Sequence, residues 1–380
     1  MHLGENSTNM LRILKKIGMY ILILLVLLVI GTLVFVNTSP HFGQVPKGED
    51  LKRIKQSEHF EDGIFVNLVE TTVGDFWTAM KKLPEMLNTK GKIPEGALPS
   101  SFDDHLLHAA DSAVHITWFG HSAFLIEAFE KKMLIDPMLS EYPSPLPFGT
   151  KRFEYRDTIP ISQLKNIDVV LISHDHYDHL DYPTITKIKD EVKLFVTPLG
   201  VGSHLKKWGV PAEKIVELDW WQENMAEGFK LTACPSRHFS GRGLTDRNAT
   251  QWASWVIETD TVKLYFSGDG GYGAHFKEIG NKYGPFNLAF LECGQYNEAW
   301  SDIHMMPEQS VQAGIDVKAK LAMPIHWGAF LLAPHHWKDP IERFTKTAQE
   351  QGLEFMVPEI GKPYTLGTEA PQSQWWVKAD

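Results

Sequence analysis

The chain has 380 residues, of which 43% are hydrophobic and 22% are charged, so it can bury a large core and is neither disordered nor collagen-like. Its net charge of −10 argues against nucleic acid as a partner. Two cysteines exclude a disulfide framework and a cysteine-built zinc site, whereas 17 histidines make metal or acid–base chemistry worth seeking.

The first predicted element is an uncharged apolar run from Ile17 to Val36. About 20 such residues in an α-helix span the roughly 30 Å hydrocarbon core of a bilayer. A buried core helix is one alternative, but this run has no polar face. A cleaved signal peptide is another, but the run is long for one and no A-x-A cleavage pattern follows it. We expect a membrane anchor at residues 17–36, after a short tail at 1–16.

The orientation of this anchor follows from the basic residues beside it. Arg12, Lys15 and Lys16 precede the run and favour a cytoplasmic N-terminus, with the remaining chain extracytoplasmic. Basic residues at 52, 53 and 55 weaken this orientation.

Residues 37–112 are interpreted as a connector with one short amphipathic helix, Val73–Leu83, ending before Pro84. We expect its apolar face to pack on the main domain; the alternative is that it lies at the membrane surface. That face consists of Phe76, Trp77, Met80 and Leu83.

From residue 113 the pattern changes to short β-rich runs, first HITWFG, SAFLIEA and KKMLIDP. Later apolar runs alternate with helical stretches, which indicates sheets covered by helices, an α/β layered architecture. We expect this domain to cover residues 113–365, with a C-terminal tail at 366–380.

A cluster of metal-competent residues follows the apolar run DVVLIS at 168–173. On an extended loop, residues i and i+2 point to the same side, so His174 and His176 can reach one metal ion. Asp178 and His179 lie just beyond and can reach a second point. Imidazole and carboxylate ligands suit zinc, and also iron or manganese.

Three further candidates each follow a predicted strand: His238, Asp269 and His326. Sites in α/β sheets gather at the carboxyl ends of strands, so these side chains can converge on the first cluster. His174, His176 and His238 could hold one ion, and Asp178, His179 and His326 another. Asp269 taken alone could equally be a turn residue. His121 is expected on an early strand near the site, where a structural role is favoured over a catalytic one. Asp136 is interpreted as a supporting residue or loop cap.

The stretch HDHYDHLD resembles the H-x-H-x-D-H motif of the metallo-β-lactamase fold superfamily, which also uses His238, Asp269 and His326 in this order. Further stretches are similar to the N-acyl-phosphatidylethanolamine-hydrolysing phospholipase D branch, over about residues 112–362. They are IDPMLSEYPSPLPFGTKRF, PSRHFSGRGLTDRNATQWASW, YFSGDGGY and HMMPEQSVQA.

This resemblance implies a four-layer αβ/βα sandwich with two zinc ions at one edge, bridged by Asp269. It also implies hydrolysis of a phosphodiester to phosphatidic acid and an N-acylethanolamine. Two metal ions about 3.5–4 Å apart would generate the attacking hydroxide from water. A phospholipid and the bilayer would be the partners, and a homodimer stays open. The membrane anchor departs from the peripheral members of the family.

Asp178, Asp269 and His304 are the predicted catalytic residues, although His304 could be only a helix-entry residue before Pro307. Arg237 and Arg247 could pair with phosphate oxygens or form surface salt bridges. Tyr296 and Trp300 could line an acyl-chain groove or pack in the core.

Two alternatives to the phospholipase function stay open. The first is a lactonase or another phosphodiesterase of the same fold, because substrate identity is the least transferable property of a fold. The second is a membrane-tethered binding protein without catalysis.

Overall fold

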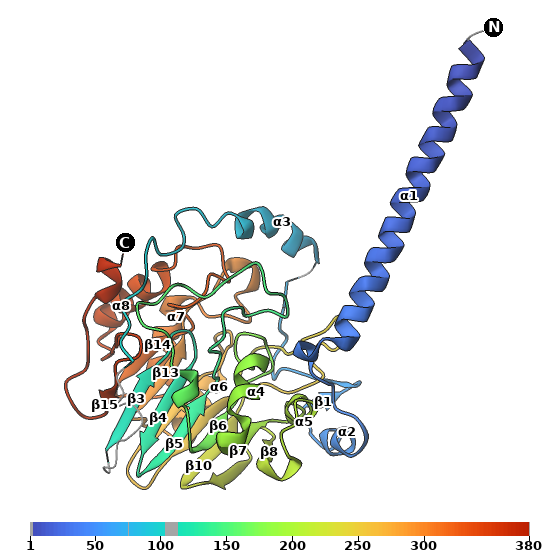
Figure 1. The fold of residues 1–380 in the computed structure, drawn as a ribbon. Helices are drawn as coiled ribbons and strands as arrows, with labels where there is room; N and C mark the ends of the chain where they lie inside the picture. Colours follow the sequence, from blue (N-terminus) through green and yellow to red (C-terminus); the bar gives the residue numbers. More distant parts are fainter. Residues whose placement is uncertain (1–2, 75, 103–112, 380) are drawn as a thin grey trace. The chain divides into compact units, whose positions relative to one another are not determined.

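The structure is a computed structural model that describes residues 3–74, 76–102 and 113–379. It divides into two units, Met1–Phe42 and Gly43–Asp380. The first unit is the long helix α1 (Leu3–Thr38) with a short 3₁₀ turn at Pro40–Phe42 (Figure 1). Residues Arg12–Thr38 of α1 are long and apolar enough to cross a membrane, and none of that stretch is buried.

The second unit contains a seven-stranded and a six-stranded sheet. The first has the order β15-β3-β4-β5-β6-β7-β8, and β5 to β8 run parallel. Its strands are β3 (Val114–Trp118), β4 (Phe124–Ala128), β5 (Lys131–Ile135), β6 (Ile167–Leu171), β7 (Val192–Pro198), β8 (Ile215–Leu218) and β15 (Tyr364–Thr365).

The second sheet has the order β14-β13-β12-β11-β10-β9, and β12 to β14 run parallel. Its strands are β9 (Glu223–Ala226), β10 (Phe229–Cys234), β11 (Ser254–Glu258), β12 (Lys263–Phe266), β13 (Leu288–Glu292) and β14 (Ala322–Ile325). A separate hairpin joins β1 (Phe60–Glu61) to β2 (Ile64–Phe65).

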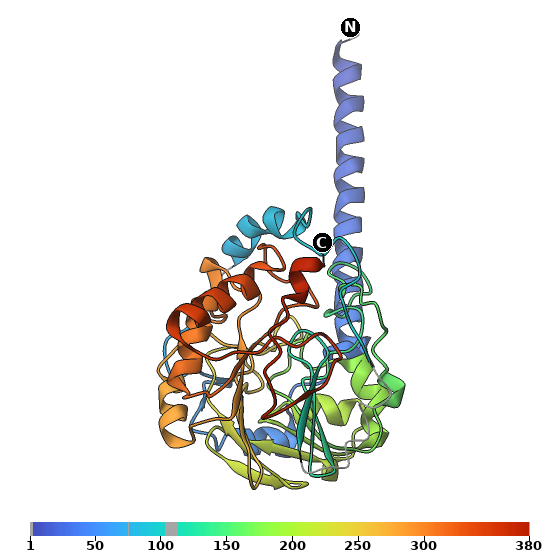
Figure 2. The same cartoon turned by 90° about the vertical axis from the view of Figure 1, so that its left-hand side faces the viewer.

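Helices cover the outer faces of the two sheets, as Figures 1 and 2 show. The helices of this unit are α2 (Gly48–Ile54), α3 (Phe76–Leu87), α4 (Tyr182–Ile188), α5 (Gly202–Lys207), α6 (His275–Lys282), α7 (Pro307–Asp316) and α8 (Asp339–Gln351). Short 3₁₀ turns occupy Ile161–Gln163, Lys189–Glu191, Ala212–Lys214, Glu298–Trp300 and Trp375–Lys378.

Alternation along the central strands explains the layers. Met133 and Ile135 of β5 face the core that lies between the sheets, where Phe124 of β4 packs on Phe290 of β13 at 4.6 Å. Leu134 of β5 faces a second core, under α4 and α5. Because successive side chains of a strand point to opposite faces, one strand serves both cores. The predicted four-layer αβ/βα sandwich, preceded by one apolar helix, is confirmed.

The amphipathic helix ends later than predicted. It continues through Pro84 to Leu87, although proline removes one helical hydrogen bond. Lys92 donates a hydrogen bond from Nζ to the Glu85 carbonyl at 3.1 Å, which satisfies one of the orphan carbonyls near the C-terminal end of the helix. Residues 103–112 of the predicted connector lie outside the described residues.

The C-terminal segment packs into the domain. Trp375 and Trp376 are buried beside Trp327, with the rings of Trp375 and Trp327 stacked at 5.4 Å. Trp118 of β3 also contacts both Trp375 and Trp327. Residues beyond 365, which the sequence suggested to be a tail, therefore close one side of the core.

Trp375→Ala is expected to lower the free energy of unfolding by about 3–5 kcal/mol, because it leaves a cavity in a stacked indole cluster. Val377→Ala is the matched control, since Val377 is 53% exposed two residues away. Thermal unfolding of both variants measures the difference. Equal melting temperatures would show that the segment adds little stability.

Glu127 of β4 introduces a pH dependence into folding. It lies opposite His115 of β3 and Lys132 of β5, and burial raises the pKa of its carboxyl from 4.5 to about 7. Between these two pKa values the folded chain keeps a proton that the unfolded chain loses. Stability therefore falls as the pH rises through this window.

Glu127→Gln should leave the melting temperature unchanged near pH 4.5 but raise the stability above pH 7. The gain should be about 1–2 kcal/mol, after discounting the shift for nearby solvent. Thermal unfolding at the two pH values tests this. A gain of the same size at both would mean that the carboxylate charge is not the cause.

Candidate metal centre

Three imidazoles from two loops form the first group of the site. The loop after β6 carries His174 and His176, and the loop after β10 carries His238. Nε2 of His174 lies 2.9 Å from Nδ1 of His176, and Nε2 of His238 lies 3.2 Å from the same atom. Three ring nitrogens therefore converge on one point and could hold one metal ion.

A second group consists of His121, Asp178, His179 and His326. Oδ2 of Asp178 lies 3.0 Å from Nε2 of His121 and 3.6 Å from Nε2 of His179. His121 is fully buried, and its ring lies 4.1 Å from that of His326. His121, which the sequence placed near the site, thus lies among the predicted ligands.

Asp269 follows β12 and lies between the two groups. Its Oδ2 is 3.0 Å from Nε2 of His179 and 4.0 Å from Nε2 of His174. Its Oδ1 is 3.2 Å from Nδ1 of His326 but makes no hydrogen bond with any described residue. A buried carboxylate oxygen without a hydrogen bond is costly, and a cation shared by both groups would satisfy it. We call these eight residues the His/Asp cluster.

For three histidines of the cluster, the ring nitrogen that faces away from the centre is held by the protein. Nδ1 of His174 is 2.9 Å from Oγ of Ser173, and Nδ1 of His238 is 3.0 Å from the Ile303 carbonyl. Nδ1 of His179 is 2.7 Å from Oδ2 of Asp136, which agrees with the supporting role predicted for Asp136. Such bonds fix the ring orientation and leave Nε2 facing the centre, as in protein metal sites.

Burial sets the charge state of the cluster. It lowers the pKa of His174, His238 and His326 well below the usual value, and that of His176 to about 4. Neutral imidazoles at pH 7 are what a divalent cation requires. The donor set of nitrogen and carboxylate oxygen suits zinc, iron or manganese.

The pKa values of His179 and of the two carboxylates are set by neighbouring charges as well as by burial. Burial opposes the charged form of His179, but Asp269 and Asp178 together raise the pKa of its imidazole well above the usual value. Burial raises the pKa of Asp269 to about 6. Burial also opposes ionisation of Asp178, yet His179 and His121 hold its pKa well below the usual value.

His304 lies at the rim of the cluster. Its ring is 5.2 Å from that of His238 and 5.4 Å from that of His326. Its Nδ1 is 3.0 Å from Oε1 of Glu292, whose pKa burial raises well above the usual value. Glu292 ends β13, and the strand-end rule that found Asp269 could have found it too.

Of the predicted substrate contacts, Arg247 is linked to the cluster through an aromatic neighbour. Its guanidinium lies over the ring of Phe239 at 5.3 Å, and that ring contacts His176 at 4.4 Å. Arg237 instead pairs with Asp302 at 3.0 Å.

The two predicted apolar contacts have protein partners. Tyr296 is buried, donates a hydrogen bond to Asp339 and stacks on His335 at 4.3 Å. Trp300 is half-buried and donates a hydrogen bond from Nε1 to the Gln295 carbonyl at 2.9 Å.

A buried arginine braces the histidine loop, which the sequence analysis did not foresee. Arg242 donates hydrogen bonds from Nη1 to the carbonyls of Asp175 and Leu180, and its guanidinium stacks on Tyr177 at 4.1 Å. Burial opposes the charged state of Asp175, but a hydrogen bond from His204 and its charge bring the carboxyl pKa down. Asp175 and Tyr177 thus anchor the loop, while His174 and His176, which alternate with them, face the centre.

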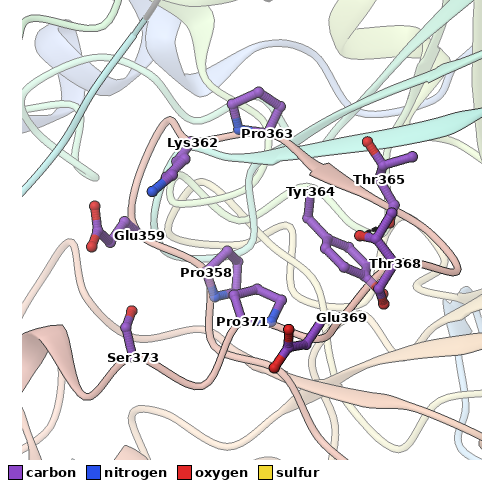
Figure 3. A pocket seen from close by; sticks show the side chains of 10 residues that line it. All are labelled: Pro358, Glu359, Lys362, Pro363, Tyr364, Thr365, Thr368, Glu369, Pro371 and Ser373. Atoms are coloured by element: carbon purple, nitrogen blue, oxygen red, sulfur yellow. Dashed lines mark hydrogen bonds between the residues drawn. The ribbon is translucent and has the colours of Figure 1, made fainter.

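A separate pocket of about 260 Å³ lies near the C-terminus (Figure 3). Pro358, Glu359, Lys362 and Tyr364 are among its lining residues, and none of its lining residues belongs to the His/Asp cluster.

The sandwich fold and the cluster at its strand ends define a metal-dependent hydrolase of metallo-β-lactamase fold. The family model described as the β-lactamase superfamily domain matches residues 131–327, just over half of the chain. The chain belongs to this superfamily.

Two relatives are similar to this chain in sequence, and one solved structure is similar in fold. An uncharacterized protein of Mycobacterium tuberculosis is 37% identical over 328 residues, covering 85% of this chain and 88% of that one. The N-acyl-phosphatidylethanolamine-hydrolyzing phospholipase D 1 of Caenorhabditis elegans is 32% identical over 264 residues, covering 65% and 72%. The metallo hydrolase Igni18 of Ignicoccus hospitalis superposes with a TM-score of 0.53 at 22% identity, covering 68% of this chain and 100% of that one.

Arg242→Lys should weaken zinc binding about 10–100-fold, because lysine keeps the charge but loses the planar stacking and the fork that holds the histidine loop. Competition with a chromophoric chelator, on protein first stripped of metal, measures the affinity. Arg247→Lys is the control, since Arg247 is exposed. A lower melting temperature of the stripped Arg242 variant with unchanged zinc affinity would assign Arg242 to folding alone.

Proposed function

We propose that this hydrolase is a membrane-anchored phosphodiesterase of phospholipase D type, which cleaves N-acyl-phosphatidylethanolamine to an N-acylethanolamine and phosphatidic acid. The observation that carries the hydrolytic part is the pair of ligand groups joined by Asp269, whose Oδ1 makes no hydrogen bond with any described residue. The similarity to the nematode phospholipase D supports the substrate class.

His174, His176 and His238 would hold one metal ion, and Asp178, His179 and His326 the other, with Asp269 contacting both. Zinc is the favoured metal, with iron or manganese as alternatives. When bound, two divalent ions supply a hydroxide nucleophile near neutral pH and stabilise negative charge on phosphate oxygens.

The chain's own residues would orient the reacting groups. His121 contacts Asp178 through Nε2 at 3.0 Å and would hold that carboxylate toward the nucleophile. Glu292 contacts Nδ1 of His304, so Nε2 would be the atom of His304 that contacts the leaving oxygen of the N-acylethanolamine.

The remaining predicted contacts would bind the lipid. Arg247 is exposed beside Phe239 and would pair with a phosphate oxygen. Arg237 could do so only while sharing its guanidinium with Asp302. Trp300 would line the path of an acyl chain, together with Tyr296.

The helix α1 would be the membrane anchor. Arg12, Lys15 and Lys16 precede its uncharged stretch and favour a cytoplasmic N-terminus with an extracytoplasmic catalytic domain.

The direct test incubates the purified full-length protein, in detergent, with N-acyl-phosphatidylethanolamine and detects phosphatidic acid by mass spectrometry. We expect product from the wild type and at least a 100-fold loss in Asp178→Asn, because the amide keeps the shape but removes the ionic ligand. Circular dichroism checks that the variant is folded.

Wild-type turnover by Asp178→Asn with full metal loading would remove the role of Asp178. Absence of product from the wild type, with metal bound, would remove this substrate, and lactones and simple phosphodiesters would be assayed next.

A further inference from the structure

The helix α3 turns its apolar side chains outward. Trp77, Met80, Leu83 and Leu87 recur at helical spacing and are exposed by 70%, 46%, 42% and 73%. A helix that packs on its own domain places such a stripe inward. The packing that the sequence analysis favoured for this face is therefore wrong for Trp77, Met80 and Leu83.

The half-buried residues of the same helix lie outside this apolar stripe. Thr78, Lys82 and Met86 are half-buried, and Lys82 pairs with Glu85 at 3.0 Å. The amphipathic helix is thus oriented with its apolar face to the surroundings. Contiguous exposed apolar surface of this kind marks an interaction site.

The chain that leads into α3 is fixed to the metal centre. Asn67 accepts a hydrogen bond from the backbone N–H of His238 at 3.1 Å and donates one to the His238 carbonyl at 2.8 Å. Arg237 donates to Oγ1 of Thr71 at 3.1 Å. Residues 67–72 therefore tie the approach to α3 to the His238 loop, and Figures 1 and 2 both show α3 at an outer edge of the domain.

The composition of this surface fits a bilayer. Exposed Leu68 and Val69 lie in the connecting 67–72 segment. Two exposed basic residues accompany the stripe, Lys81 and Lys90. Aromatic and leucine side chains on one face, with lysines beside them, are typical of helices that lie in the headgroup layer of anionic membranes. The same chain also carries an apolar helix long enough to cross a membrane.

We propose that α3 docks in the interfacial layer of an anionic bilayer and holds the His238 side of the metal centre at the lipid surface. The delivery of a lipid substrate to that centre rests on the proposed function, whereas the docking does not.

Spin labels on the full-length protein test the docking. Cys234 and Cys293 are buried, so Leu87→Cys and Glu85→Cys place a single accessible thiol on opposite faces of α3. Each labelled protein is reconstituted into vesicles of phosphatidylcholine and phosphatidylglycerol. We expect the label at 87 to gain collisions with oxygen and lose collisions with a water-soluble nickel chelate, while the label at 85 stays in water.

Two results would overturn the proposal. Equal access of the nickel chelate to both labels would place α3 in water. Low access of both reagents to the label at 87, with spin–spin broadening, would show that a second copy of the chain covers the stripe.

An activity measurement separates this proposal from the proposed function. Leu87→Glu should raise the apparent KM for bilayer lipid about tenfold while leaving turnover of bis(p-nitrophenyl) phosphate unchanged. An equal effect on both substrates would assign Leu87 to the fold. Absence of turnover by the wild type on both would defeat the proposed function, and the label data would still decide the docking.

Discussion

The burial of many ligand-type groups at one point is the constraint on which the rest of the domain depends. Ring nitrogens of His174 and His238 lie 2.9 and 3.2 Å from Nδ1 of His176, and Asp269 buries a carboxylate oxygen without a hydrogen bond from any described residue. Without a cation this arrangement is unfavourable, because desolvated lone pairs oppose each other. Metal binding and the correct fold of these loops are therefore thermodynamically linked.

The backbone around the cluster is strained as well, which adds to the free-energy cost of forming the site. His121, Asp136 and His326 have φ values of 56°, 38° and 68°, in the left-handed region that non-glycine residues rarely adopt. Gly294 allows the close approach of the His326 carbonyl, since a Cβ there would lie 1.7 Å from it. The two packed cores hold these turns, because the last three residues of each preceding strand, β3, β5 and β14, are buried.

Sequence patterns predicted the strands and the residues that follow them, because both depend on residues that are close together in the chain. The apolar run at 168–173 and the spacing within His174–His179 suffice to identify β6 and its polar loop. His121 and Arg242 escaped a full assignment because their roles depend on partners far away in the chain: His121 contacts Asp178 and Arg242 contacts Asp175, 57 and 67 residues apart. Periodicity likewise identified the apolar face of α3, but it cannot reveal which side of a helix the domain covers.

The net charge of −10 does not conflict with an anionic phospholipid as substrate. Charges of the distant surface are screened within about 10 Å in salt, so the local field at the site decides binding. Two divalent ions, as proposed, would carry four positive charges against the two carboxylates of Asp178 and Asp269. In the proposed docking, Arg247 and the exposed Lys81 of α3 would add positive charge on the route of the lipid. An acidic protein can therefore attract a phosphate group at its metal centre. Its net negative charge still opposes the many phosphates of a nucleic acid. A nucleic acid also lacks the acyl chains that the apolar face of α3 would contact.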